Sequence, residues 1–204
     1  MSREVHVRFC ESREVRFLPA THLVVLCRSA AQAERAHQQA RALLGDLGLV
    51  LHPDKTRVVD LREGKEGFDF LGCHLRARMS GKLWEQKRIV RYYLHRWPSA
   101  RSMKRARARI KDLTDRRRVG MELQDVIGAL NLFLRGWGNY FRTGNAAHKF
   151  RQIDRHVAWR LKRLLMKKRG RNLRAGQAGK WTEGWFHDQN LHKLMGTIRY
   201  PKTA

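Results

Sequence analysis

The sequence is short of acidic residues, of cysteine and of long apolar runs. Asp and Glu number 18 against 44 Lys and Arg, which leaves a net charge of +26 and a pI near 11.4. A surplus of this size strains a compact fold by self-repulsion, so we expect the protein to work beside a polyanion. Apolar residues still make up 42% of the chain and aromatic ones 9%, which excludes a disordered basic tail.

The other two shortages concern location and chemistry. The longest apolar runs, such as residues 23–27, are far shorter than the ~20 residues of a membrane-spanning helix. The first residues also lack the apolar segment of a secretory signal. The 3 cysteines are widely separated, and no pair has the spacing of a zinc site. We therefore expect a reduced, cytoplasmic protein with no disulfide framework, no metal and no membrane partner.

The positive charge is concentrated in the second part of the chain. Residues 1–80 hold 13 Lys and Arg against 10 Asp and Glu, whereas residues 81–204 hold 31 against 8. This asymmetry indicates two parts with different roles, of which the second contacts the polyanion.

The first part shows mixed strand and helix patterns. Short apolar runs predict strands over 22–28, 56–61 and 68–73. Between the first two, Ser29 and Gln32 have the spacing of a capping box before a helix with an apolar face of Ala33, Ala36, Ala40, Leu43, Leu44 and Leu47. We expect Gly81 to close a hairpin whose second strand covers 83–93.

From Pro98 onward the pattern is helical. Three amphipathic helices are expected, one capped by Ser99, one opening at Glu122 and one over 146–168, with short connections typical of a bundle. A basic, glycine-rich loop over 170–180, a short helix over 182–190 and a strand over 197–200 complete the prediction. The expected fold is α+β, with a domain of mixed strands and helix at 1–96, a basic helical domain at 97–169 and a terminal segment at 170–204.

No catalytic constellation is visible. His37, His52, His74 and His95 are scattered without carboxylate partners at the spacing of metal ligands, and we expect each to be structural or exposed. The acids on the basic helices are expected to form local ion pairs; they are Asp112, Asp115, Asp125 and Asp154. No phosphate loop, nucleophile elbow or zinc protease motif appears, so we assign no catalytic residue, no metal ligand and no cofactor.

Several segments, in order, resemble one family. Residues 67–75 (GFDFLGCHL), preceded by 51–60 (LHPDKTRVVD), resemble the end of the palm of a group II intron reverse transcriptase. Residues 97–151 resemble the thumb, or domain X, of these maturases, most specifically at 135–141 (RGWGNYF). The end of the chain, GTIRYP, is also similar. The resemblance assigns primer-grip-like roles to Phe70, Leu71 and Gly72, and a palm lysine to Lys55.

Two departures from the family concern catalysis. The fingers and the first half of the palm, with its aspartate, are absent from this sequence. Where the family has Tyr-Ala-Asp-Asp, residues 17–23 read FLPATHL, and no carboxylate occurs between Val15 and Glu34. Polymerisation needs carboxylates that hold two Mg²⁺ about 3.5–4 Å apart. We therefore expect no polymerase activity, and Mg²⁺ only in an intact family member.

The resemblance implies RNA binding. In the family, this thumb grips structured intron RNA and assists splicing of the mobile intron, and helix-borne Lys and Arg suit phosphate contacts. The residues we assign to RNA binding are Lys104, Arg105, Arg109, Arg135, Trp137, Tyr140, Arg151, Arg155, Arg160, Lys162 and Lys167. Core packing is the competing interpretation for Trp137, Tyr140 and Phe141 because they share helical spacing with apolar neighbours. For residues 116–118, a solvated turn is an equal alternative.

Three functions therefore remain open at the level of sequence. The first is an RNA-binding, maturase-like fragment without polymerase activity. The second is the C-terminal part of an RNA-directed DNA polymerase, completed by a separate chain that supplies fingers and catalytic aspartates. The third is a decayed relic.

Overall fold

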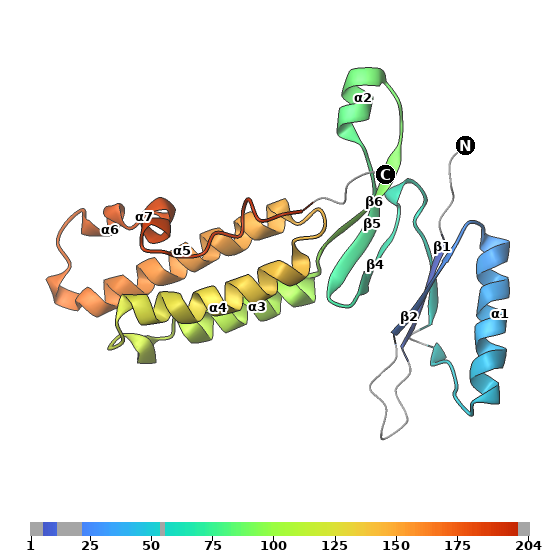
Figure 1. The fold of residues 1–204 in the computed structure, drawn as a ribbon, viewed down its shortest axis with the longest axis horizontal. Helices are drawn as coiled ribbons and strands as arrows, with labels where there is room; N and C mark the ends of the chain where they lie inside the picture. The colour runs from blue at the N-terminus through green and yellow to red at the C-terminus, as the bar shows by residue number, and fades with distance from the viewer. Residues whose placement is uncertain (1–5, 12–21, 54–55, 200–204) are drawn as a thin grey trace. The chain divides into compact units, whose positions relative to one another are not determined.

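The computed structural model describes residues 6–11, 22–53 and 56–199 and divides into two compact units, Met1–His95 (unit 1) and Arg96–Ala204 (unit 2). Strands and two helices make up unit 1, whereas unit 2 is almost entirely helical (Figure 1). The α+β prediction is confirmed. None of the helices in the described part of the chain combines the length and the apolarity needed to cross a bilayer.

Unit 1 contains an antiparallel sheet with its first strand in the middle. Strand β1 (His6–Glu11) pairs on one side with β2 (His22–Cys27) and on the other with β3 (Arg57–Asp60). The register places Val7 opposite both Leu26 and Val59. The strands predicted at 22–28 and 56–61 are therefore confirmed.

Helix α1 (Ala30–Asp46) contacts β1 and β2. Ser29 caps it, since its Oγ accepts a hydrogen bond from the Gln32 N–H at 3.2 Å, as the sequence predicts. The Gln32 side chain accepts from the N–H of Arg28 at 2.8 Å, one residue earlier than in a standard capping box. Only part of the predicted apolar face is covered, because Ala33 is buried whereas Leu43 is 66% exposed.

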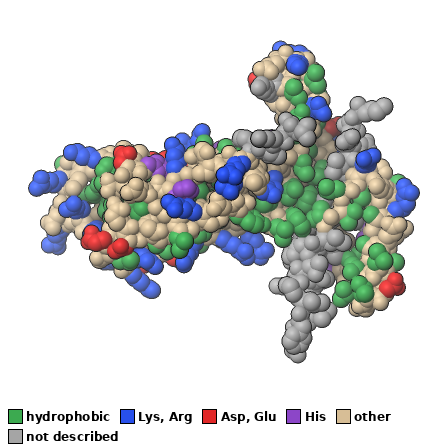
Figure 2. Space-filling view, in the orientation of Figure 1, with side chains coloured by type: hydrophobic (Ala, Val, Ile, Leu, Met, Phe, Trp, Pro, Cys, Tyr) green, Lys and Arg blue, Asp and Glu red, His purple; other side chains and the backbone are tan. Residues whose placement is uncertain are grey.

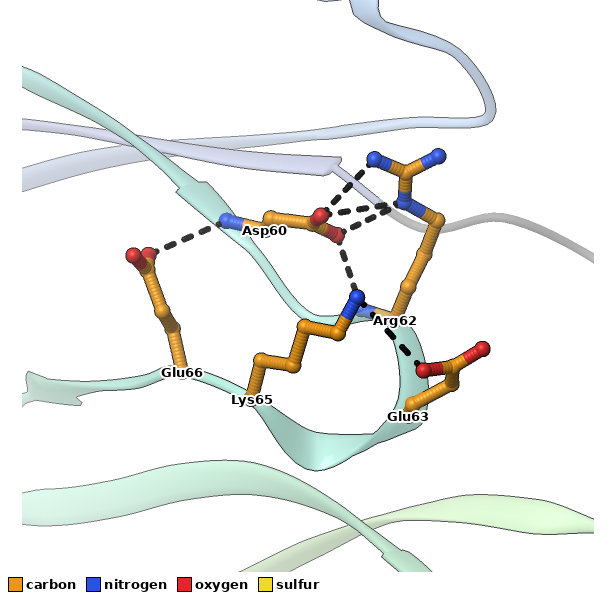
Figure 3. Close-up of polar contacts among 5 residues, drawn as sticks. All are labelled: Asp60, Arg62, Glu63, Lys65 and Glu66. Atoms are coloured by element: carbon orange, nitrogen blue, oxygen red, sulfur yellow. Dashed lines mark hydrogen bonds and ion pairs between the residues drawn. The ribbon is translucent and has the colours of Figure 1, made fainter.

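Polar contacts fix the connection from β3 to the next strand (Figure 3). The Arg62 guanidinium donates to both Asp60 carboxylate oxygens, with distances of 2.8–3.0 Å, and the Arg62 N–H donates to Asp60 Oδ1 at 2.9 Å. The Glu66 carboxylate accepts a hydrogen bond from the Asp60 N–H at 3.3 Å, and the Lys65 Nζ lies 3.5 Å from Glu63 Oε2. These acids are therefore engaged in shaping a turn around the 3-10 helix η2 (Arg62–Gly64).

A hairpin of β4 (Gly67–Phe70) and β5 (Cys73–Met79) follows. Leu71 and Gly72 connect them with φ angles of +45° and +75°, so the single strand predicted over 68–73 is wrong. Two successive positive φ angles give the tight hairpin turn whose twist matches the strands. Phe68 is 1% exposed and packs with Val59 and Leu61 in a small core.

The second strand of this hairpin corrects the interpretation of one histidine. His74 Nδ1 lies 2.6 Å from a carboxylate oxygen of Asp69, its cross-strand partner in the register. His74 therefore has a carboxylate partner that its position in the sequence does not suggest, in a structural cross-strand pair. Pairing across a strand register brings together side chains five residues apart, and isolated spacing in the sequence does not show this.

The strand predicted over 83–93 is also wrong for most of its length. Residues Gly81–Lys87 form helix α2, capped by Ser80, whose Oγ accepts from the Leu83 N–H at 3.4 Å. The cap and the good helix formers Lys, Leu, Glu and Gln favour a helix here. Strand β6 (Tyr92–Pro98) begins only afterwards and is the neighbour of β5 in a second sheet.

Unit 2 is built on the three predicted helices, α3 (Ala100–Leu113), α4 (Leu123–Phe141) and α5 (Ala147–Arg169). The predicted loop at 170–180 contains the short helices η4 (Gly170–Asn172) and α6 (Gln177–Lys180). Helix α7 (Glu183–Asp188) confirms the short helix, with Thr182 as its cap. Residues 197–199 form no strand, although the Arg199 N–H donates to the Arg142 carbonyl at 2.8 Å. Tyr200 lies outside the described residues.

The segment after α5 completes the core of unit 2. Trp181, Phe186, Leu191 and Leu194 are all less than 9% exposed. A Cβ at Gly138 of α4 would lie 2.6 Å from the Leu194 side chain, so the second glycine of the Arg-Gly-Trp-Gly motif allows this close approach. Residues 181–194 therefore contribute to the same hydrophobic core as the three long helices.

Candidate nucleic-acid interface

Helices α3 and α5 pack together and set the direction in which their cations project. Ser99 begins α3, since its Oγ accepts from the Ser102 N–H at 3.2 Å, which confirms the predicted cap. The predicted inward residues are all buried: Met103, Ala106, Ile110 and Leu113 on α3, and Phe150, Ile153, Val157, Leu161 and Leu164 on α5. Residues between these positions are turned outward by the helical repeat.

The outward side of α5 carries a row of cations. Arg151 and Arg155 are four residues apart and exposed, and Lys162 and Arg163 follow two turns later on the same side. Figure 2 shows Lys and Arg side chains gathered over the helices of unit 2, with few acidic ones between them. We call Arg151, Arg155, Lys162 and Arg163 the α5 cationic row.

The cations of α3 lie on two different sides of that helix. Lys104, Arg105 and Arg109 are all exposed. Lys104 is three residues before Arg107, whose guanidinium donates to the Gln152 side chain of α5 at 3.4 Å, so this side borders the α5 cationic row. Arg105 and Arg109 are four residues apart and form a separate row. The structure therefore brings Lys104 to the neighbourhood of α5 but places Arg105 and Arg109 elsewhere on α3.

Arg160 has a structural environment that the sequence does not reveal. Its Nε donates to the Thr114 hydroxyl at 2.9 Å, and its terminal nitrogen donates to the carbonyls of Thr114 at 3.0 Å and Lys111 at 3.3 Å. These carbonyls belong to the last turn of α3, whose acceptors have no partner within the helix. Arg160 thus caps α3, a role that helical spacing does not indicate.

The aromatic run of α4 is divided between core and surface. Trp137 is half-buried, with its ring centroid 4.9 Å from that of Phe141 and 5.5 Å from that of Phe150, so it is a packing residue. Tyr140 is 53% exposed and meets Phe141 edge-on at 4.7 Å. Arg135 is exposed, and its charge adds to the burial that lowers the pKa of His192.

The C-terminal end of α5 lies near the connection between α3 and α4. Asp115 begins the 3-10 helix η3 (Arg116–Arg118), and its carboxylate accepts from the Arg117 N–H at 3.1 Å. This hydrogen bond is the main reason that the pKa of Asp115 is lowered, and the charge of Lys167 contributes to the same effect. Lys168 is held by the carbonyl of Met121 at 2.8 Å. Lys167 and Arg169 are the other exposed cations at this end of α5.

Asp154 differs from the expected surface ion pair. It is 3% exposed, and its two carboxylate oxygens each accept a backbone hydrogen bond at 3.0 Å, from Leu194 and from Met195. Burial raises the pKa of Asp154 despite these two hydrogen bonds. Its role is to hold the segment after α7 against α5, which sequence spacing alone does not indicate.

Sequence reasoning missed Trp159. Its side chain is 48% exposed in the middle of α5, between Arg155 and Arg163. The guanidinium carbon of Arg163 lies 4.8 Å from its ring centroid, and that of Arg160 lies 5.9 Å away. Helical spacing could have indicated its exposure, because Trp159 comes directly after the buried residues Val157 and Ala158 and is not among the residues predicted to face inward.

The remaining predicted residues lie in unit 1. Phe70, Leu71 and Gly72 form the end of β4 and the hairpin turn, with Leu71 57% exposed. Lys55 and the segment 12–21, which includes most of the departure from Tyr-Ala-Asp-Asp, lie outside the described residues. Within the described ranges, His, Cys, Asp and Glu side chains form no group of three that could hold a metal ion.

A helical unit with a dense row of outward-facing Lys and Arg has the charge pattern that is typical of polyanion-binding domains. More particularly, residues 103–181 match the family model described as the group II intron, maturase-specific domain. The match runs from α3 to the end of α6, so it includes the α5 cationic row and Trp159. No curated protein matches the chain. The resemblance of the first part to a reverse-transcriptase palm, including its altered Tyr-Ala-Asp-Asp region, stays a prediction.

Proposed function

We propose that the protein binds structured group II intron RNA through unit 2 and assists splicing without polymerising DNA. The observation that carries this proposal is the α5 cationic row, which lies inside the segment matched to the maturase-specific domain. Its cations project from a rigid helix and can follow phosphates along an RNA helix. The RNA then supplies the splicing chemistry, and the protein holds it in an active shape.

The proposed RNA-binding residues are fewer than those assigned from the sequence. Arg151, Arg155, Lys162 and Arg163 form the centre, Lys104 and Lys167 extend it, and Tyr140 and Arg135 lie on α4. Arg160 is omitted because it caps α3, and Trp137 because it packs against two phenylalanines. Arg105 and Arg109 form a second row whose contribution the same experiments can measure.

Charge reversal tests the proposal. Replacing Arg151, Arg155 and Lys162 together by Glu should weaken binding of group II intron RNA and of a plain RNA duplex alike. The slope of log K against log salt should also become shallower, by about 0.7–0.9 for each phosphate that the variant no longer neutralises. Fluorescence anisotropy with labelled RNA across a salt series measures both quantities. The variant's circular dichroism should match that of the unmodified protein, because all three side chains lie outside the buried rows.

A matched control has the same change in charge in unit 1. Arg35, Arg41 and Arg57 are exposed on α1 and β3, and replacing them by Glu should change affinity and slope much less. A splicing assay with a group II intron transcript at limiting Mg²⁺ should show more spliced product with the unmodified protein than with the α5 variant. Equal affinities and slopes for the two triple variants would contradict the proposed RNA face.

A further inference from the structure

Trp159 has an unusual environment for a tryptophan. Of the tryptophans in unit 2, Trp181 is buried and Trp97, Trp137 and Trp185 are half-buried, whereas Trp159 is 48% exposed. Its neighbours along the outward side of α5 are mainly cations. Tryptophan is enriched at binding interfaces because it combines a large apolar ring with a polar N–H group, so an exposed tryptophan among cations is a candidate ligand contact.

Three groups surround the indole ring. The Arg163 guanidinium lies over the ring at 4.8 Å, the Arg160 guanidinium is at 5.9 Å, and the His156 ring is 5.8 Å away at 31°. Arg160 is held by the end of α3, and His156 is partly buried with a pKa lowered by burial and by two arginines. Arg163, by contrast, is exposed on a long side chain, so its guanidinium can turn from the ring to a ligand.

We propose that Trp159 and Arg163 form a stacking site for an unpaired nucleotide of the bound RNA. An indole ring offers a surface for one base, and Arg163 and Arg155 on either side offer donors for the adjoining phosphates. A base inside a continuous duplex has both faces covered by its neighbours, so the site selects a bulge, a loop or a strand end.

This inference rests on the proposed function and adds the class of RNA feature that the surface selects. The α5 cationic row holds phosphates of any sequence, which gives affinity without discrimination. A stacking site in the same row discriminates in favour of helices interrupted by unpaired nucleotides. The stacking site does not discriminate between nucleotide sequences, because every base has a face that can stack.

The test compares two RNAs with the full-length protein. One is a continuous duplex hairpin, and the other is the same hairpin with a three-nucleotide bulge. The unmodified protein should bind the bulged hairpin more tightly. Trp159→Ala should weaken binding of the bulged hairpin by roughly tenfold, the loss of one base stack, and leave the continuous hairpin nearly unchanged. Trp159→Phe should keep much of the preference and Trp159→Leu should not, because leucine keeps apolar volume without a ring to stack.

Trp84 provides the matched control, since it is 39% exposed with the Arg88 guanidinium 5.3 Å from its ring but belongs to unit 1. Trp84→Ala should leave both affinities unchanged. Equal weakening of both hairpins by Trp159→Ala, or a preference restored by leucine, would overturn the stacking site. Should the alanine variant lose helicity, the phenylalanine and leucine variants decide the question. Failure of the proposed function looks different, because the unmodified protein would then bind neither hairpin in a salt-dependent way.

Discussion

Asp154 connects two parts of unit 2 that are distant in sequence. Its carboxylate accepts from the backbone N–H groups of Leu194 and Met195, both at 3.0 Å. Asp154→Ala leaves these donors without their acceptor, so the free energy of unfolding should fall by roughly 2–4 kcal/mol. Asp154→Asn should lower the free energy of unfolding by less, because the amide oxygen still accepts one of the two hydrogen bonds. Urea unfolding followed by circular dichroism measures both, and a loss within experimental error for the alanine variant would show that the contact contributes little.

The same side chain gives the stability a dependence on pH. Burial raises the pKa of Asp154 in the folded protein above its ordinary value of 3.8. The folded state therefore keeps its proton at pH values where the unfolded state has lost it, so the contribution of Asp154 to stability falls as pH rises from 3.8 through the raised pKa. The unfolding free energy of the unmodified protein and of Asp154→Asn should be measured at a series of pH values. Their difference should decrease as pH rises from 3.8 and become constant above the raised pKa of Asp154.

Sequence reasoning located surface cations better than it assigned their roles. Exposure of Arg151 and Arg155 follows from helical spacing alone, and the structure agrees. Arg160 has the same kind of spacing, yet it hydrogen-bonds to Thr114, 46 residues away. Trp159 was missed for the opposite reason, because an exposed tryptophan contradicts the usual preference for burial. The role of Arg160 depends on a neighbour from elsewhere in the chain, whereas the neighbours of Trp159 are residues of α5 itself.

At the level of elements, helices were predicted more accurately than strands. The buried rows of α3 and α5 repeat over several turns, so many residues support each assignment. The hairpin of β4 and β5 depends on two residues, Leu71 and Gly72, of which only the glycine favours a positive φ. Helix α2 depends on a single serine cap at its start. Short elements have few residues to specify them, and tertiary contacts decide between alternatives.

The helices of unit 2 also depend on the segment that follows them. Trp181, Phe186 and Leu194 are buried in its core, and Asp154 binds the backbone after α7. A fragment covering 96–204 should therefore unfold cooperatively. One that ends at residue 169 should melt at a much lower temperature and less cooperatively, because it exposes apolar surface and leaves the Asp154 carboxylate without its N–H donors.

Thermal unfolding of the two fragments, followed by circular dichroism at 222 nm, measures the difference. A third fragment with Phe186→Ala keeps the full length but removes a side chain that is 0% exposed, and it should melt between the other two. Equal melting temperatures for the fragments ending at 169 and 204 would show that the three long helices form a complete core by themselves.

For the molecule as a whole, the distribution of buried side chains differs between the two units. Among the described residues, the core of unit 1 centres on Val59, Leu61 and Phe68, whereas unit 2 buries apolar residues from every one of its long helices. Unit 1 also leaves large apolar side chains exposed on and after α1, including Leu43, Leu47 and Val50. The positive charge and the match to the maturase-specific domain both belong to unit 2. Binding is therefore expected to depend on unit 2.

The last prediction concerns DNA synthesis. Two-metal polymerisation needs carboxylates that hold Mg²⁺ against the attacking and leaving oxygens, and no Asp or Glu occurs between Val15 and Glu34, where the resembled family has two aspartates. The full-length protein, given a primed RNA template, Mg²⁺ and deoxynucleotides, should extend the primer no further than a protein-free mixture does. An active reverse transcriptase in a parallel reaction shows that the template is usable, and RNA binding in the same buffer shows that the protein is folded. Replacing Ala20 and Thr21 by Asp should not create activity in this 204-residue chain, since two-metal catalysis needs a further carboxylate placed beside these two. Primer extension that disappears when Asp60 or Asp69 is replaced by Asn would contradict the proposal and place the catalytic carboxylates in unit 1.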